Sequence, residues 1–288
     1  MTDLRAAASG TNPSVAYYRK DMMDLDAWFR VTQVDYERLI EQLSPRELFG
    51  DTPSGAYRLL DLGCGTARFP ALLDRTIADD LHVAADLLDI SDYCLNAAVA
   101  QYRALHHFSP AMTYLSAIED LGRSVDRSRR FDVIWAIHSL CTVAQDRIAE
   151  VCRFCWDALK PNGTFLIYQL ARNSSYYRLY DYYLTHYPAP NSATRMLASE
   201  DHQEILSSLG IGYEVRRIRF THRIAQDERQ LLEVYLRKCV MDHDAEVLEF
   251  FRPVLDEQAT PEQAQYRFDQ EVDLLMIHKP GDDGPAAA

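Results

Sequence analysis

Asp61 stands two residues before Gly63 and four before Gly65, at the end of a short apolar run. The run covers Leu59–Leu62, and an apolar-periodic stretch over Phe69–Leu73 follows the glycines. This pattern predicts a buried strand, a tight turn and the start of a helix. Glycines let a backbone approach a ligand closely, and the first N–H groups of a helix point toward whatever lies there. The turn is therefore predicted to be a ligand-binding loop with a carboxylate beside it.

Two residues indicate which ligand this loop binds. A dinucleotide-binding loop has the pattern Gly-x-Gly-x-x-Gly, with glycine or alanine at the third glycine position. This sequence has Arg68 at that position. A dinucleotide would also set two phosphates against the carboxylate of Asp61, which like-charge repulsion opposes. S-adenosylmethionine suits the loop better, because its amino-acid end carries an ammonium for Asp61 and a carboxylate for the loop N–H groups. We expect Gly63, Cys64 and Gly65 to contact this cofactor.

A second acid lies at the end of the next predicted strand, within His82–Ile90. The carboxylate of Asp89 can accept both hydroxyl groups of a ribose, as acids at this position do in nucleotide sites of this topology. Ser91 and Asp92 follow it and can cap the next helix. Asp89 is therefore predicted to bind the ribose, whereas Asp86 is expected to point elsewhere along the strand.

The composition bounds the class of protein. The chain has 288 residues, of which 48% are hydrophobic, and its six cysteines show no disulfide pattern. A net charge of −13 argues against a nucleic-acid partner and mildly favours cationic small molecules. We find no apolar run of transmembrane length and no secretory pattern, so we expect a soluble, cytoplasmic protein with no membrane partner. Cys152 and Cys155 have metal spacing, but helix packing explains them better, and we predict no metal.

Strands alternate with helices over most of the chain, which predicts a parallel sheet with right-handed crossovers. The expected strands are 57–62, 82–88, 112–115, 131–137, 165–170, 213–224 and 273–278, and the expected helices are 91–106, 146–159, 199–209 and two or three within 227–268. We predict a disordered N-terminus (1–13), a helical lid (14–50), a cofactor-binding core (51–170), the remaining core strands with helical substrate-binding insertions (171–280, insertions at 171–198 and 226–270) and a flexible tail (281–288).

The loop sequence Leu59–Thr66 resembles the first motif of class I S-adenosylmethionine-dependent methyltransferases. The turn Pro161–Thr164 is similar to the family's element before its fifth strand. From about Tyr18 to Lys279 the layout resembles the histamine N-methyltransferase family, through the segment Phe131–Leu140, the aromatic cluster after the fifth strand and the long insertion before the last strand. The resemblance implies an α/β, Rossmann-like fold with a seven-stranded sheet, helices on both faces and helical insertions that form a substrate chamber. Relatives are mostly monomeric, so a monomer is expected by analogy.

The same resemblance implies further site residues. His138 follows the fourth strand, where relatives place an amide that contacts the substrate; a histidine bonded only to the backbone is the alternative. The tyrosine-rich segment after the fifth strand is expected to line the pocket, although a stripe at helical spacing is more often core. The remaining expected cofactor contacts are Ala117, Ile118 and Ile137, and the remaining expected substrate contacts are Tyr17, Tyr18, Tyr176, Tyr180, Tyr187 and Gln270 or Glu271.

These features predict an enzyme that transfers a methyl group to a small molecule, cationic or aromatic. N-methylation of an amine or imidazole is the first hypothesis, with His138 as a proton acceptor or hydrogen-bond partner. An O- or C-methyltransferase on a small acid or phenol is the alternative. A non-catalytic S-adenosylmethionine-binding module is less well supported, because the motif residues Asp61, Gly63, Gly65 and Asp89 are all present. An NAD-dependent oxidoreductase is the weakest, because of Arg68 and Asp61.

Overall fold

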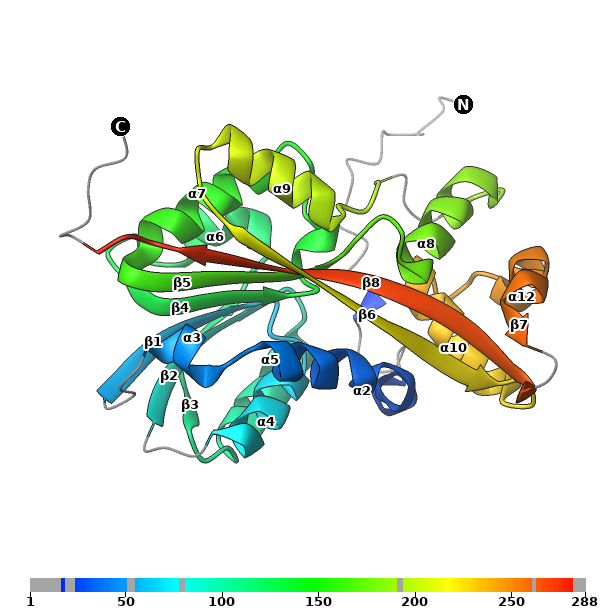
Figure 1. The fold of residues 1–288 in the computed structure, drawn as a ribbon, viewed down its shortest axis with the longest axis horizontal. Helices are drawn as coiled ribbons and strands as arrows, with labels where there is room; N and C mark the ends of the chain where they lie inside the picture. Colours follow the sequence, from blue (N-terminus) through cyan, green and yellow to red (C-terminus); the bar gives the residue numbers. More distant parts are fainter. Residues whose placement is uncertain are drawn as a thin grey trace, which may run out of the picture.

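A twisted sheet in the order β3-β2-β1-β4-β5-β8-β6, with the short β7 paired to β8, forms the centre of the computed structural model (Figure 1). The structure describes residues 17–18, 24–50, 55–77, 81–190, 194–260 and 263–281. Strands β1 to β5 are parallel, whereas β8 runs antiparallel to β5 and β6. The strands are β1 (Gly55–Leu62), β2 (Leu81–Asp89), β3 (Phe108–Leu115), β4 (Phe131–Ile137), β5 (Leu159–Leu170), β6 (Glu214–Ala225), β7 (Ala259–Thr260) and β8 (Gln265–His278). The predicted N-terminus 1–13 and all but the first residue of the predicted tail 281–288 lie outside the described residues.

Helices cover both faces of the sheet, because successive strand residues point to opposite faces. Leu59 packs into the hydrophobic cluster that includes α2, α4 and α5, and Leu60 packs into the cluster that includes α6, α7 and α9 (Figure 1). The α-helices are α2 (Leu25–Gln42), α3 (Pro45–Phe49), α4 (Arg68–Leu73), α5 (Asp92–Tyr102), α6 (Leu121–Ser124), α7 (Ile148–Ala158), α8 (Ser175–His186), α9 (Ser199–Ser208), α10 (Arg229–Val240), α11 (Val247–Phe250) and α12 (Arg252–Gln258). The predicted α/β fold is confirmed.

Local sequence signals set several of these boundaries. The side chain of Ser91 accepts a hydrogen bond from the backbone N–H of Cys94, so α5 begins at the predicted cap. The predicted turn at Pro161–Thr164 is instead an irregularity inside β5, where Asn162 has φ +61° and the pairing with β4 shifts its register. Cys152 and Cys155 are fully buried on α7 in the second cluster, which matches the core-packing interpretation.

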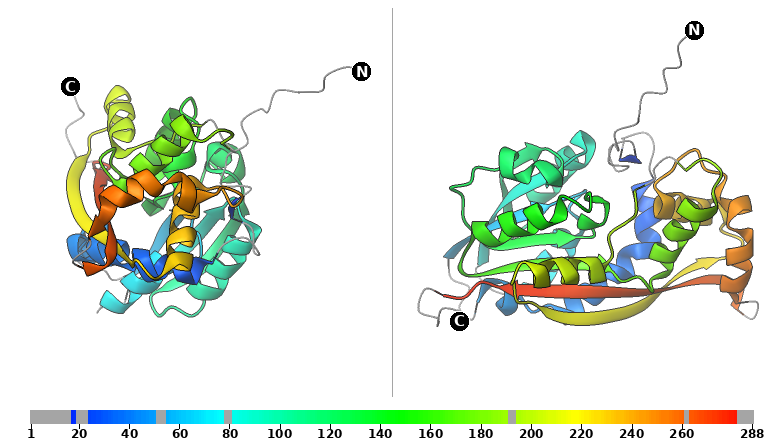
Figure 2. Two further views of the ribbon diagram at one scale, coloured as in Figure 1. Left: turned by 90° about the vertical axis from the view of Figure 1, so that its right-hand side faces the viewer. Right: turned by 90° about the horizontal axis from the view of Figure 1, so that it is seen from above.

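The long antiparallel pair β6 and β8 continues past the parallel strands (Figure 2). Residues 272–278 of β8 pair with β5, and residues 265–276 pair with β6 on the other side. At the outer end, residues 265–266 also pair with β7. Helices α8 and α12 contact this extension and α10 packs on α8 and α2. The predicted insertion 226–270 is therefore helical only as far as Gln258, because residues 265–270 are strand. Their side chains alternate between buried Phe268 and Gln270 and exposed Asp269, a strand pattern.

Candidate active site

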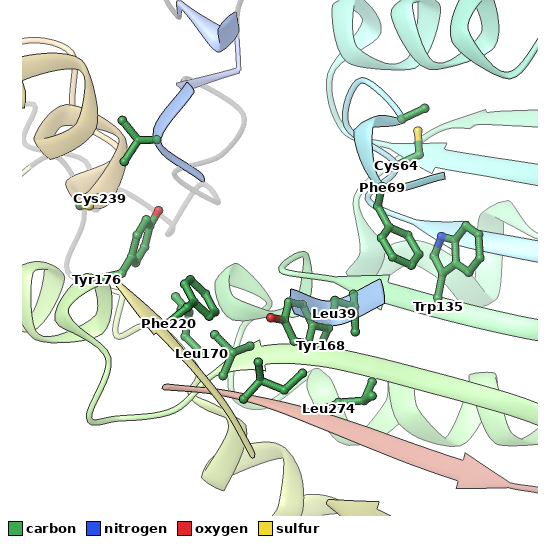
Figure 3. Packing of buried hydrophobic residues seen from close by; sticks show 14 of the residues in the cluster. Leu39, Cys64, Phe69, Trp135, Tyr168, Leu170, Tyr176, Phe220, Cys239 and Leu274 are labelled. Carbon is green, nitrogen blue, oxygen red and sulfur yellow. The ribbon is translucent and has the colours of Figure 1, made fainter. Parts of the chain in front are cut away.

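A pocket of about 200 Å³ opens at the carboxyl ends of β1, β2 and β4. In open α/β sheets ligands bind at this edge, where the strand order reverses, here between β1 and β4. The far wall of the pocket comes from α2, α8, α10 and the extension of β6 and β8. Figure 3 shows the two sides, with Cys64 and Phe69 near the β1 loop and Tyr176 beside Cys239 of α10. The pocket therefore has one side built by the predicted cofactor-binding core and one built by later segments.

The glycine loop after β1 is fixed by its own hydrogen bonds. The N–H groups of Gly63 and Cys64 donate to the carbonyl of Leu88 at 2.8 and 3.0 Å, and the N–H of Gly65 donates to Asp89 Oδ2 at 2.8 Å. These three N–H groups were expected to hold a ligand carboxylate. Because each already has an acceptor within the protein, their role in this structure is to hold the loop against β2.

Position 63 admits only glycine. Gly63 has φ +68°, and a Cβ built there would lie 2.5 Å from the Cβ of Ser139. Non-bonded carbon atoms do not approach so closely, and L-residues avoid this φ. The loop can therefore pass this close to the segment after β4 only with glycine at this position.

Two buried carboxylates face the pocket. Asp61 is 4% exposed and accepts a hydrogen bond from the Tyr102 hydroxyl at 2.8 Å. Burial raises the pKa of Asp61 to about 7, because the ionised form loses hydration. Asp89 is 7% exposed and its Oδ1 also accepts the N–H of Ser91 at 2.8 Å. Burial raises the pKa of Asp89 as well, opposed by its backbone hydrogen bonds.

Two buried hydroxyl groups in the pocket wall lack partners. Thr66 Oγ1 and Ser139 Oγ make no hydrogen bond with any residue that the structure describes. Buried polar atoms are nearly always satisfied by protein, water or ligand. With the carboxylates of Asp61 and Asp89 in the same wall, these hydroxyls fit a ligand that carries an ammonium, a carboxylate and hydroxyl groups. S-adenosylmethionine has this set of groups.

Helix α2 forms the roof of the pocket. Trp28, Thr32, Asp35 and Tyr36 recur at helical spacing and line it, so one face of α2 covers the opening. At its amino-terminal end Asp26 is ion-paired with Arg68, the residue at the third position of the glycine loop. The arginine thus links the loop to the helix above it, where a dinucleotide loop would have glycine.

His138 is held by a carboxylate from the roof. Its Nε2 lies 2.8 Å from Asp35 Oδ2, and Asp35 Oδ1 accepts the hydroxyl of Tyr168 at 2.6 Å. Its other ring nitrogen, Nδ1, is buried without a hydrogen-bond partner among the described residues. The backbone of His138 has φ +54°, a conformation that non-glycine residues adopt at a cost and mostly where a tight turn or a site requires it. When Nε2–H of the neutral ring donates its hydrogen bond to Asp35, the lone pair of the ring is on Nδ1.

The aromatic wall surrounds a lysine. Lys238 of α10 lines the pocket, is 8% exposed and donates to the Tyr176 hydroxyl at a long 3.4 Å. Its Nζ lies 4.9 Å from the ring centroid of Tyr18, 5.5 Å from that of Trp28 and 5.9 Å from that of Tyr176. Tyr18 and Tyr176, two of the predicted substrate contacts, are therefore already packed around a cation of the protein itself.

A hydrogen-bonded chain crosses the β6–β8 side of the pocket. Gln270 accepts the N–H of Tyr176 through its side-chain oxygen and donates to the hydroxyl of Tyr235 at 3.2 Å. The same hydroxyl lies 3.0 Å from His222 Nδ1. Burial lowers the pKa of His222 to about 4, so the ring is neutral, and its Nε2 has no partner among the described residues.

Most of the predicted site residues meet in this one pocket. Those in its wall are Tyr18, Asp61, Gly63, Cys64, Gly65, Asp89, Ile118, Ile137, His138, Tyr176 and Gln270. Tyr17, Ala117, Tyr180, Tyr187 and Glu271 lie outside the wall.

The excluded tyrosines pack elsewhere. Tyr17 stacks on His243 at 4.0 Å between ring centroids, behind Tyr18. The hydroxyl of Tyr180 donates to the carbonyl of Thr194, and the ring of Tyr187 packs on Phe250. Of the tyrosine stripe, only Tyr176 at its start reaches the pocket.

The uncertain pair Gln270 and Glu271 is resolved by strand geometry. Neighbouring residues of β8 point to opposite faces, so Gln270 turns inward and Glu271 outward. Glu271 forms ion pairs with Arg217 at 3.2 Å and Arg219 at 2.9 Å on that outer face.

Sequence reasoning missed several polar residues of the pocket, of which Asp35, His222 and Lys238 make the contacts described above. Each occupies a position that its element's pattern assigns to the core. Asp35 lies on the same face of α2 as Trp28 and Thr32. His222 is one of the buried residues that recur at every second position of β6. Lys238 falls on the buried face of α10 that carries Tyr235 and Cys239. A charged or polar residue at a core position was the available signal.

The described residues contain neither a membrane-spanning helix nor a metal-binding cluster. None of their helices combines the length and the apolar composition needed to cross a bilayer. Within the same residues, His, Cys, Asp and Glu side chains form no group of three or more that could hold a metal ion.

Comparison with known proteins agrees with this geometry. Residues 60–165 match the family model described as a methyltransferase domain. A search of curated proteins gives no significant match. The matched segment runs from β1 to β5 and carries Asp61, Gly63, Gly65 and Asp89. The chain is thus similar to a methyltransferase domain over the segment that carries the predicted cofactor residues.

Solved structures confirm the Rossmann-like fold. BH2331 of Bacillus halodurans aligns with a TM-score of 0.56 at 14% identity and covers 86% of this chain and 99% of its own. The mycolic acid cyclopropane synthase CmaA1, complexed with SAH and CTAB, aligns at 0.53 and 17% identity, covering 91% and 88%. The plantazolicin methyltransferase BamL, in complex with a triazolic desmethylPZN analog and SAH, aligns at 0.51 and 15% identity, covering 93% and 94%. At these identities the similarity shows the fold, and the resemblance to histamine N-methyltransferases stays a prediction.

Proposed function

We propose that this protein is an S-adenosylmethionine-dependent methyltransferase that acts on a small molecule. One observation carries the proposal: a single pocket joins the carboxylates of Asp61 and Asp89 to the His138–Asp35 pair and an aromatic wall. The methyltransferase domain over residues 60–165 supports it, as do neighbours of the same fold that were solved with SAH. The acceptor then lies between His138 and the wall formed by α8 and α10.

The chain's own groups suit this cofactor. Asp61 would hold the ammonium of the cofactor, and Asp89 would accept its ribose hydroxyls. Ile118 and Ile137 would border the rest of the cofactor. Thr66 and Ser139, each with an unpartnered buried hydroxyl, would meet the carboxylate or the hydroxyls. S-adenosylmethionine supplies a methyl group already activated on a sulfonium sulfur, so the protein has to orient the acceptor and exclude water.

His138 would remove the proton of the acceptor. Because Nε2–H donates its hydrogen bond to Asp35, Nδ1 carries the lone pair, and the Asp35 carboxylate would stabilise the imidazolium that forms. The hydroxyl of Tyr168 fixes the carboxylate in turn. His138 thus has the partner that a general base requires, which a histidine bonded only to the backbone would lack.

The acceptor atom is a nitrogen or an oxygen that carries a removable proton. An amine or imidazole nitrogen, as first expected, suits a base at His138. A phenol or acid oxygen is the second candidate, and Lys238 favours it because a buried ammonium in the same pocket would stabilise an oxyanion. The fold itself leaves the acceptor open, since one neighbour of this fold is a cyclopropane synthase.

We also propose a division of the chain by role. Helix α2, which lies within the predicted lid, would close the pocket over both ligands. Strands β1 to β5 would carry the cofactor, and the β6–β8 extension with α8 and α10 would carry the substrate wall. The ion pair between Asp26 of α2 and Arg68 would hold the lid to the cofactor loop.

A methyl-transfer assay tests the proposal. Labelled S-adenosylmethionine is incubated with the protein and panels of amines, imidazoles, amino acids, phenols and aromatic acids. The proposal predicts a labelled product from at least one panel. Binding of S-adenosylhomocysteine without transfer to any panel would instead favour the non-catalytic module.

Asp35→Asn separates the base from the binding site. The amide keeps the size of Asp35 but cannot stabilise an imidazolium, so the turnover number should fall by about 10²–10⁴. Affinity for S-adenosylhomocysteine should stay unchanged, as Asp35 contacts His138 and Tyr168. Tyr168→Phe, which leaves the carboxylate in place, is the milder control. Full turnover in Asp35→Asn would remove His138 from its assigned role.

A further inference from the structure

Lys238 is a buried cation to which no carboxylate of the described residues is paired. It is 8% exposed in the wall of the pocket, and it forms no ion pair with a carboxylate among the residues that the structure describes. Its side-chain hydrogen bond, to the Tyr176 hydroxyl, is 3.4 Å long. Burial lowers the pKa of Lys238, as expected for an ammonium that has lost its hydration. A charge in this setting destabilises the folded protein unless something pairs with it.

The acids of the same pocket do not serve as that partner. Asp35 binds His138 and Tyr168, Asp61 accepts the Tyr102 hydroxyl, and Asp89 accepts two backbone N–H groups. Glu119, the fourth acid in the pocket wall, accepts the backbone N–H of Ala144 through Oε1, and no ion pair joins any of these four described acids to Lys238. The positive charge on the α10 side of the pocket therefore faces the space that the substrate would occupy.

The rings around Lys238 hold it in place. Four rings from three separate segments approach its Nζ within 6 Å of their centroids, those of Tyr17, Tyr18, Trp28 and Tyr176. Cation–π contacts of this kind orient an ammonium without neutralising it. A cationic substrate group placed against the same rings would meet a like charge. The rings of Tyr18 and Tyr176, which were expected to contact the substrate, thus already surround a cation of the protein.

We propose that Lys238 recognises a carboxylate of the methyl acceptor, and that the substrates are small aromatic or heteroaromatic acids. The inference rests on the proposed function and narrows it. The carboxylate pairs with the Lys238 ammonium, and the planar ring of the acid packs on the aromatic rings beside it. A nitrogen or hydroxyl elsewhere on the same acid then meets His138.

Three probes of one shape separate the possibilities. Benzoate, benzamide and benzylammonium share a ring and differ in carrying a negative, no or a positive charge. Each is titrated by calorimetry into the protein saturated with S-adenosylhomocysteine. We expect benzoate to bind at least about tenfold more tightly than benzamide, and benzylammonium to bind most weakly. Equal affinities, the reverse order or no binding of benzoate would overturn the proposal.

Variants assign the preference to Lys238. Lys238→Met keeps the length without the charge and should remove the preference for benzoate, and Lys238→Gln serves as a second neutral variant. Lys238→Arg should retain it. Lys160→Met is the matched control, because it removes a lysine charge that is paired with Asp132 away from the pocket. A preference for benzoate that survives both neutral variants would also overturn the proposal.

Different results would contradict the proposed function and the role of Lys238. Saturation with S-adenosylhomocysteine is verified first, by titration of the wild-type protein. A protein that does not bind S-adenosylhomocysteine contradicts the proposed function itself. A protein that binds it but shows no preference for benzoate contradicts only the role of Lys238.

Discussion

Asp61 and Asp89 are chemically alike, yet the structure gives their charges different support. Asp89 accepts two backbone N–H groups, which stabilise its ionised form, whereas Asp61 has one neutral hydroxyl partner. Burial therefore raises the pKa of Asp61 to about 7. An ammonium bound beside Asp61 would favour its ionised form, so we expect the Asp61 carboxyl group to be ionised when the cofactor is bound.

This difference predicts a pH-dependent affinity for the cofactor. In the proposed role, ionised Asp61 binds the ammonium of S-adenosylhomocysteine, and below the pKa of about 7 the free protein must first lose the proton of Asp61. Affinity should therefore be about tenfold weaker at pH 6 than at pH 8 and level off above pH 7. Calorimetric titration across this range measures it. Asp61→Asn should bind weakly at every pH, and a wild-type affinity independent of pH would contradict the role of Asp61.

Single residues also mark what the sequence could reveal. Asp61, Gly63 and Asp89 were found because a local pattern of strand, turn and helix fixes their positions. Asp35 and His138 lie 103 residues apart and meet only because α2 packs over the sheet, against β6. Lys238 reads locally as one more charged helix residue beside Arg237, and only the burial of α10 shows that its charge faces the pocket.

At the scale of elements, the glycine loop depends on a close approach to the segment after β4. Gly63→Ala should place a Cβ 2.5 Å from Ser139 Cβ and strain φ at +68°, for a loss of about 1–3 kcal/mol. Gly210→Ala is the matched control, with the same φ of +68° and no atom within 4 Å of its Cβ. Thermal unfolding of both variants measures the difference. An equal loss of stability in the two would show that the loop does not depend on this contact.

The strands after residue 200 show where element prediction failed. The alternation of Phe268, Asp269 and Gln270 lies next to helical sequence, so the last strand was expected to begin at 273, although β8 begins at Gln265. The early half of β8 has no partner in β5; it is stabilised by β6. Such pairing depends on a segment forty residues earlier, which no local pattern reports.

At the scale of the molecule, the two parts of the pocket differ in how far the sequence determines them. The parallel half follows a strand–helix alternation whose topology is restricted to few arrangements, and it was predicted nearly in full. The substrate half is built from the roof helix, α8, α10 and the β6–β8 extension, which meet only in the folded chain. The chain as a whole carries a charge of −13, yet its pocket presents Lys238 to the substrate space. Net charge, which favoured a cationic ligand, thus gave no guide to the charge on the α10 side of the pocket.

The central claim is that one pocket holds the cofactor through Asp89 and activates the acceptor through His138. Titration calorimetry of S-adenosylhomocysteine into Asp89→Ala and His138→Ala tests it, with Asp86→Ala as the control because Asp86 is a buried acid of the same strand that pairs with Arg129 outside the pocket. We expect Asp89→Ala to lose at least about 100-fold in affinity, through the loss of charge-assisted hydrogen bonds, while His138→Ala and Asp86→Ala bind like the wild type. Unchanged affinity in Asp89→Ala would contradict the account.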